Sequence, residues 1–183
     1  HISTRLTGIE IREDLVSKCN GIAQQCQFSG LNFLPGFIEA TTVNKTDMLI
    51  ALHACDTATD DAIAKGVKAG AKYIICSPCC HKQIRPQLKP ENGLAHITQY
   101  GILKERYAEM LTDTIRALIL ESQGYKTKIM EYVSTEHTPK NLLIIAVKRD
   151  LINEDHSLSA LNKIAEIKSL SGIEKHHLES LLK

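Results

Sequence analysis

Reactive side chains gather directly after two apolar runs of the sequence. The run at residues 47–54, DMLIALHA, leads into the stretch His53–Asp56, and the run at 71–77, AKYIICS, leads into Cys79–His81. Continuous apolar runs of this length are typical of strands covered on both faces. In an open parallel sheet, ligands bind at the carboxyl ends of the strands. We therefore expect the candidate site at these two strand ends.

His53 interrupts an apolar strand where that strand should emerge at the ligand edge. A histidine there could act as a general base, donate a hydrogen bond to a substrate, or bind a metal ion. The presence of Asp56 three residues further on favours a functional role for His53. The alternative is a histidine packed in the crevice with its hydrogen bonds satisfied.

The stretch Cys76–His81, with its C-x-x-C pair and nearby histidine, is compatible with a zinc site. His53 and Cys55 would then complete four ligands. Pro78 lies inside the pair and no second C-x-x-C follows, which weakens this interpretation.

Other chemistry is open to the same cysteines. Thiol–disulfide exchange between Cys76 and Cys79 is one possibility, although a thioredoxin-like context is absent. Covalent catalysis by Cys79 or Cys80 would require a base, such as His53 or His81, close by. The remaining interpretation is a tight turn whose side chains line a pocket.

Composition limits the classes of protein that the chain can belong to. It has 183 residues, with 22 Lys and Arg against 21 Asp and Glu, so no strong basic field points to nucleic acid. Apolar residues make up 43%, and this length suits one folded domain. No apolar run approaches the ~18 residues of a membrane helix. The six cysteines do not resemble a secreted disulfide framework, so we expect reduced thiols and a cytoplasmic protein.

Alternating strand and helix patterns predict an α/β fold. The sheet should be mostly parallel with helices on both faces, and the short loop before the last strand predicts a C-terminal antiparallel hairpin. Thr57-x-x-Asp60 resembles a capping box. We expect a main domain over residues 1–150 and a helical tail over 151–183 packed on it. The expected strands are 5–11, 31–40 with a break at Pro35-Gly36, 47–54, 71–77, 125–133 and 142–149. The expected helices are 12–28, 57–68, 97–123 and 157–183, the last with a break at Ser171-Gly172.

The motifs at these strand ends resemble those of class I S-adenosylmethionine-dependent methyltransferases. The likeness extends over residues 6–150 and is to the subgroup with H-x-C, A-T-D and C-C-H elements. Similar pairs of motifs occur in tRNA 2′-O-methyltransferases of the acceptor stem and in bacterial methyltransferases of unassigned substrate. The matching stretches are His53-Ala54-Cys55, Ala58-Thr59-Asp60 and Cys79-Cys80-His81, with TGIE ending at Glu10.

The resemblance implies a Rossmann-like fold, S-adenosylmethionine as cofactor, and methyl transfer, with RNA the favoured substrate class. It also implies roles for particular residues. Glu10 would hold the ribose hydroxyls, Phe37 and Ile38 would flank the adenine, and Leu52 and His53 would lie by the methionine end; His53, Asp56, Cys80 and His81 would serve the acceptor, with His53 or Asp56 as the base.

The chain departs from this family in its first residues. The glycine-rich loop precedes the acid by about 20 residues in nucleotide-binding Rossmann units, and only nine residues precede Glu10. Loss of the first strand would leave two sheet pieces with unpaired buried backbone, which is costly. We therefore expect the sequence to be the C-terminal part of a longer chain, or a partner or swapped segment to fill the gap. Two alternatives remain: a non-catalytic binding module with this fold, and a zinc protein built on His53, Cys55, Cys79 and His81.

Overall fold

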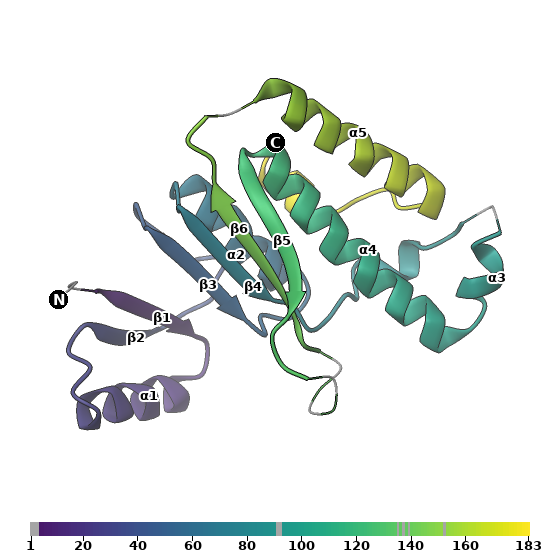
Figure 1. The fold of residues 1–183 in the computed structure, drawn as a ribbon. Helices are drawn as coiled ribbons and strands as arrows, with labels where there is room; N and C mark the ends of the chain where they lie inside the picture. Colours follow the sequence, from purple (N-terminus) through teal and green to yellow (C-terminus); the bar gives the residue numbers. More distant parts are fainter. Residues whose placement is uncertain (1–3, 91–92, 135, 137, 139, 152) are drawn as a thin grey trace. The chain divides into compact units, whose positions relative to one another are not determined.

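A computed structural model of the protein describes residues 4–90, 93–134, 136, 138, 140–151 and 153–183. The chain divides into two compact units, His1–Thr42 and Val43–Lys183, here called the N-terminal and C-terminal units. Each unit contains one sheet, and Figure 1 labels their elements. Among the helices that the structure describes, none combines the length and hydropathy required to cross a bilayer.

The N-terminal unit is a strand–helix–strand motif. Strand β1 (Leu6–Glu10) pairs in parallel with β2 (Leu31–Pro35), and α1 (Glu13–Gln25) connects them. The Asn20 side chain of α1 both donates to and accepts from the backbone of Phe33, at 2.9 and 2.8 Å. This double hydrogen bond fixes the helix against β2.

The C-terminal unit contains a mixed sheet in the order β3-β4-β6-β5. Strands β3 (Met48–Leu52) and β4 (Tyr73–Ser77) are parallel. Strand β6 (Leu142–Lys148) is antiparallel to both β4 and β5 (Tyr125–Glu131). The α/β class and the C-terminal hairpin are therefore confirmed. In the described part of the chain, the strands form two separate sheets.

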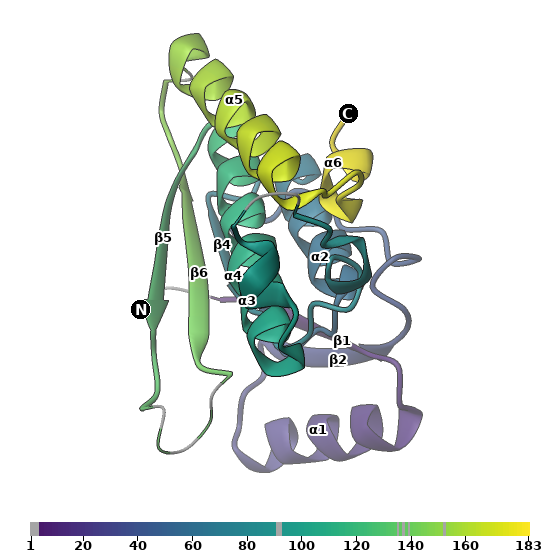
Figure 2. The ribbon, with the colours of Figure 1, turned by 90° about the vertical axis from the view of Figure 1, so that its right-hand side faces the viewer.

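Helices α2 (Thr57–Lys68) and α4 (Gly101–Ser122) both lie on one face of this sheet, and α5 (Glu154–Ser171) lies alongside α4 (Figure 2). The short helix α6 (His177–Leu181) contacts α2. The prediction of helices on both faces is therefore wrong for the described helices of this unit.

Strand β3 shows why that prediction failed. Its residue Ala51 is buried, but Met48, Ile50 and Leu52 are 45%, 51% and 61% exposed. Alternate side chains of a strand point to opposite faces, so these three lie on the face without helices. An apolar run alone did not distinguish a strand covered on both faces from one covered on a single face.

Two helix starts also differ from the predictions. The helix predicted over 97–123 consists of α3 (Ala95–Thr98) and α4, because Tyr100 between them has an extended backbone. No side chain caps the start of α2, so the predicted capping box is wrong. Its Asp60 is buried and pairs with Arg116 instead. The turn predicted through 134–141 lies partly outside the described residues.

The C-terminal tail is hydrogen-bonded to the loop that follows β4. Gln87, in the 3₁₀ turn Arg85–Gln87, donates to the carbonyl of Lys175 at 2.9 Å and accepts from the backbone of Glu174 and Lys175. The amide of Lys89 donates to the carbonyl of Ser171 at 3.1 Å. The tail therefore holds this loop along several residues.

Candidate site at the ends of strands β3 and β4

The loop after β3 is fixed against the segment after β4. The His53 amide donates to the Ser77 carbonyl at 2.9 Å, which extends the strand pairing by one residue. Asp56 Oδ1 accepts from the Gln83 amide at 3.1 Å, and the Asp56 carbonyl accepts from Arg116 Nη2 at 2.8 Å. Both His53 and Asp56 have positive φ, 57° and 52°, a strained conformation for residues with side chains. These contacts hold that conformation in place.

Three thiols meet where the two loops face each other. The sulfur of Cys79 lies 3.6 Å from those of Cys55 and Cys80, and the Cys55 and Cys80 sulfurs are 3.7 Å apart. We call this group the thiol triangle. Burial and the two neighbouring thiols raise the pKa of Cys79 to about 12. Cys55 is exposed and the other two are half-buried, so the triangle is accessible from solvent.

The fourth cysteine of this region does not join the triangle. Cys76 is only 1% exposed within β4, and burial raises the pKa of its thiol to about 12. The C-x-x-C pair is therefore divided, with Cys76 in the core and Cys79 in the triangle. Of the four zinc ligands considered from the sequence, the structure places only Cys55 and Cys79 in the triangle. Cys80 takes a place that the sequence pattern suggested for a histidine.

His81 points into the interior. It is 2% exposed, and its Nε2 lies 3.2 Å from Asp113 Oδ1. Its Nδ1 is buried without a hydrogen-bond partner, and the nearest acid oxygen, on Glu109, is 4.0 Å away. Asp113 also accepts from Arg116 at 3.1 Å, and Arg116 bonds Asp60 at 2.7 Å. His81 therefore lies at one end of a buried polar network.

Burial affects both partners of the buried ion pair. It raises the pKa of Asp60, which Arg116 opposes. Burial alone would lower the pKa of Arg116, but Asp60 and Asp113 outweigh it and raise that pKa. Asp113 and Arg116 were not among the site residues predicted from the sequence, although a charged pair spaced i, i+3 on an otherwise apolar helical stripe was a signal for them.

The predicted cofactor-binding residues lie in both units, and each unit is described separately. In the N-terminal unit, Glu10 is half-buried at the end of β1 and accepts from the Arg12 amide at 3.0 Å. Phe37 is 57% exposed just after β2, and Ile38 follows in a turn. In the C-terminal unit, Leu52 ends β3 with its side chain exposed.

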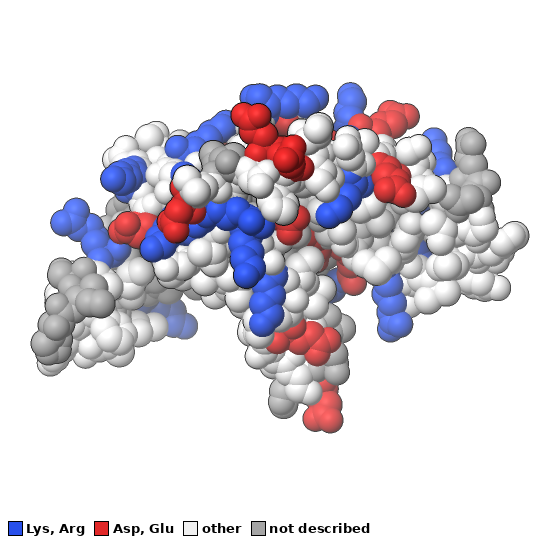
Figure 3. Space-filling model, turned by 45° about the horizontal axis from the view of Figure 1, so that its top comes forward, with Lys and Arg blue, Asp and Glu red and all other residues white. Residues whose placement is uncertain are grey.

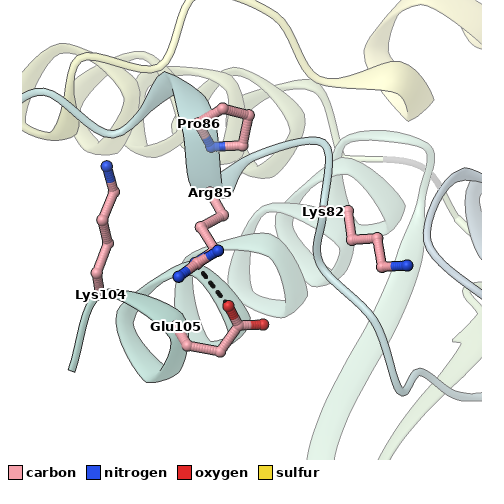
Figure 4. A pocket seen from close by; sticks show the side chains of 5 residues that line it. All are labelled: Lys82, Arg85, Pro86, Lys104 and Glu105. Carbon is pink, nitrogen blue, oxygen red and sulfur yellow. Dashed lines mark ion pairs between the residues drawn. The ribbon is translucent and has the colours of Figure 1, made fainter. Parts of the chain in front are cut away.

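A surface hollow of about 530 Å³ lies beside the segment that follows the C-C-H motif. Lys82, Arg85, Pro86, Lys104 and Glu105 line it (Figure 4). Arg85 points to Glu105 and pairs with it at 2.7 Å, whereas the Lys82 ammonium points away from this pair.

Charges of both signs are interspersed over the face that Figure 3 shows. This agrees with the nearly balanced composition of the chain. The hollow itself is lined by three cationic side chains and one acid.

Comparison with known proteins gives one match to a family. Residues 1–87 match the family described as "Methyltransferase domain", which is just under half of the chain. The chain is 25% identical over 170 residues to the "Glutathione S-transferase C-terminal domain-containing protein" of Homo sapiens and to that of Macaca fascicularis. The alignment covers 79% of this chain and 26% of each relative, so the chain spans about a quarter of their length.

Solved structures resemble the chain only distantly. The YcgJ protein from Bacillus subtilis has 10% identity and a TM-score of 0.43, and the match covers 81% of this chain and 84% of that one. The PH0226 protein from Pyrococcus horikoshii OT3 has 11% identity and a TM-score of 0.44, with 79% and 72% covered.

Proposed function

We propose that the protein transfers a methyl group from S-adenosylmethionine to an acceptor. One observation carries the proposal: residues 1–87 match a methyltransferase domain. The matched region includes Glu10 as well as both loops, His53–Asp56 and Cys79–His81. These are the residues for which the sequence resemblance implied a part in binding and transfer.

In this proposal Glu10 accepts hydrogen bonds from the ribose hydroxyls of the cofactor. Its carboxylate is held at a strand end by the Arg12 amide, which leaves acceptor capacity for a ligand. Phe37, exposed after β2, offers an aromatic face to the adenine. Leu52 offers an exposed apolar contact to the methionine end.

The chemistry is an in-line displacement. The acceptor atom forms a bond to the methyl carbon as the carbon–sulfur bond breaks, and the sulfonium becomes a neutral thioether. This step depends mainly on positioning and exclusion of water. An oxygen or nitrogen acceptor also loses a proton, for which we propose His53 as the base, because its imidazole is exposed and can accept a proton.

The other acceptor-side residues have different surroundings. Asp56 already accepts from the Gln83 amide, so we assign it to holding the loop. His81 is buried against Asp113, and we assign it to supporting the segment on which Cys80 lies. The Cys80 side chain is half-buried with its sulfur in the thiol triangle, so we assign it to lining the acceptor side of the site.

We propose RNA as the acceptor class. The supporting feature is the hollow beside Lys82, Arg85 and Lys104, since lysine and arginine contacts to phosphates dominate nucleic-acid affinity. Lys82 follows the C-C-H motif directly in the chain. A phosphate bound there would lie on the same segment as Cys80.

Isothermal titration with S-adenosylhomocysteine tests the cofactor proposal. Replacing Glu10 by alanine removes up to two charge-assisted hydrogen bonds, so we expect a loss of affinity on the order of 10²-fold. Glu13→Ala is the matched control, because Glu13 is an exposed acid of the same unit, and it should retain affinity. Absence of binding to the unchanged protein would contradict the proposal.

Transfer is tested separately with radiolabelled S-adenosylmethionine and total cellular RNA. We expect label in the RNA, and less of it with His53→Ala and with Lys82→Glu/Lys104→Glu. Binding of the cofactor product without transfer to RNA, protein or small molecules would favour the non-catalytic binding module. Transfer to a protein instead of RNA would overturn the substrate class alone.

A further inference from the structure

We propose that Cys55, Cys79 and Cys80 bind one zinc ion through their three sulfur atoms, with the fourth coordination position left to water or an incoming ligand. The proposal is independent of methyl transfer, because displacement at a methyl carbon requires no metal ion. It also differs from the ligand set that the sequence motif suggested, since His81 is replaced by Cys80.

The distances within the thiol triangle match a zinc–thiolate centre. The three sulfur–sulfur separations are 3.6, 3.6 and 3.7 Å, so the triangle is nearly equilateral. Sulfurs bound at about 2.3 Å in a tetrahedral zinc centre lie ~3.8 Å apart. A zinc ion at that bond length from all three sulfurs would therefore lie about 1 Å out of their plane, as in a tetrahedron with one open corner.

Two loops hold the thiols in this arrangement. Cys55 lies between His53 and Asp56, and hydrogen bonds fix both of these residues. His53 bonds the end of β4, and Asp56 bonds the segment after β4 and α4. Cys79 and Cys80 follow Pro78, whose ring restricts the backbone directly before them. A metal site requires ligands on such fixed supports.

The chemistry of the donors favours zinc. Thiolates are soft ligands that select zinc, copper(I) and iron–sulfur clusters over calcium or magnesium. Three thiolates with an open fourth position resemble catalytic more than structural zinc sites, which are closed by four protein ligands. Among the described residues, the cysteines are the one group of side chains at this spacing that fits a metal ion.

Without a metal ion, the same arrangement is poorly satisfied. The three thiols can exchange only weak S–H hydrogen bonds. A zinc ion would replace these contacts by three metal–sulfur bonds. The accessible side of the triangle, at Cys55, gives the ion a path from solvent.

The test is zinc binding by the purified protein. After reduction and removal of metal, Zn²⁺ is titrated in competition with a chromophoric chelator, and Co²⁺ is bound in parallel for spectroscopy. We expect one zinc ion per chain and a cobalt spectrum with thiolate charge-transfer and tetrahedral d–d bands. Cys55→Ser and Cys80→Ser should each weaken zinc binding by more than the ~10²-fold that loss of an outer-shell partner costs.

Cys26→Ser is the matched control, because Cys26 is exposed and lies far along the chain from the triangle. It should bind zinc as the unchanged protein does. Circular dichroism checks folding, and the exposed position of Cys55 favours a folded serine variant. The proposal is overturned if the unchanged protein binds no stoichiometric zinc, if Cys55→Ser binds it equally well, or if bound cobalt shows no thiolate band.

Discussion

Arg116 Nε lies 2.7 Å from Asp60 Oδ1, with both side chains at most 2% exposed. Arg116 also bonds Asp113, so one cation joins the two acids. The exposed pair of Arg12 and Asp14 has the same separation, 2.7 Å, with side chains more than 60% exposed. Because the two ion pairs have the same separation but different exposure, a comparison of their contributions to stability isolates the effect of burial.

Arg116→Leu should destabilise the C-terminal unit by about 3–5 kcal/mol, because two buried carboxylates lose their shared cation. Urea unfolding measured by circular dichroism checks this. Arg12→Ala, which breaks the exposed pair, should leave the unfolding midpoint unchanged, since surface ion pairs contribute little. Similar losses of unfolding free energy in both variants would show that burial does not determine how much an ion pair contributes to stability.

His176 should make the protein less stable in mild acid. Burial, and then Arg116, lower its pKa from 6.5 to about 3, so the folded protein holds it neutral over that range. The unfolded chain takes up a proton below pH 6.5, and stability from this residue therefore falls as pH falls from about 6.5 to 3. The slope should reach about 1.4 kcal/mol per pH unit.

Replacing His176 by asparagine should remove that pH dependence. The asparagine oxygen can still accept from the Leu178 amide, as His176 Nδ1 does. Urea midpoints at pH 7, 6 and 5 give the comparison. If the variant retained the full slope, another group would be responsible for it.

Gly66→Ala should destabilise the protein by about 1–3 kcal/mol. A Cβ at this position of α2 would lie 3.1 Å from Ile74 Cδ1 and 3.2 Å from Leu49 Cβ, on the sheet beneath. Gly101→Ala, at the start of α4, meets nothing within 4 Å and should change stability by at most about 0.5 kcal/mol. Thermal unfolding of both variants measures the difference, and equal melting temperatures would contradict the close packing.

Cys76 should resist alkylation in the folded protein. Its thiol is 1% exposed and its pKa is raised to about 12, so thiolate at neutral pH is scarce. Cys26, which is exposed, should react with iodoacetamide well before Cys76 does. Peptide mass spectrometry over time gives the order in which the cysteines are alkylated. In urea, all cysteines should be alkylated at similar rates. Early labelling of Cys76 under native conditions would show that β4 opens.

Strand positions followed well from the sequence, because apolar runs and their breaks are local signals. The end of the apolar run at 47–54 predicted the end of β3, and Pro78 predicted the end of β4, each within two residues. Asp60 shows the limit. It resembled a capping residue three positions from Thr57, whereas its partner Arg116 is 56 residues away. No local pattern encodes such a long-range pairing.

The candidate region was predictable, but its internal arrangement was not. Both loops were expected at the ligand edge from strand order alone. Whether Cys80 or His81 faces Cys55 depends on the backbone path after Pro78. His81 is buried because it pairs with Asp113, which lies on a helix distant in the sequence. The sequence therefore predicted the place of the thiols and not which side chains would meet.

The C-terminal tail, which is hydrogen-bonded to Gln87, also supports the loops of the candidate site. Gln83 accepts from the His177 amide through its side chain, while its own amide bonds Asp56, so one residue links the tail to the loop that bears Cys55. Gly172, with a φ of 70°, lets the tail pass close to the backbone of Lys89. A shortened version ending before Ser171 would keep every candidate ligand yet lose the support that positions it. Boundaries chosen for expression should therefore include α6.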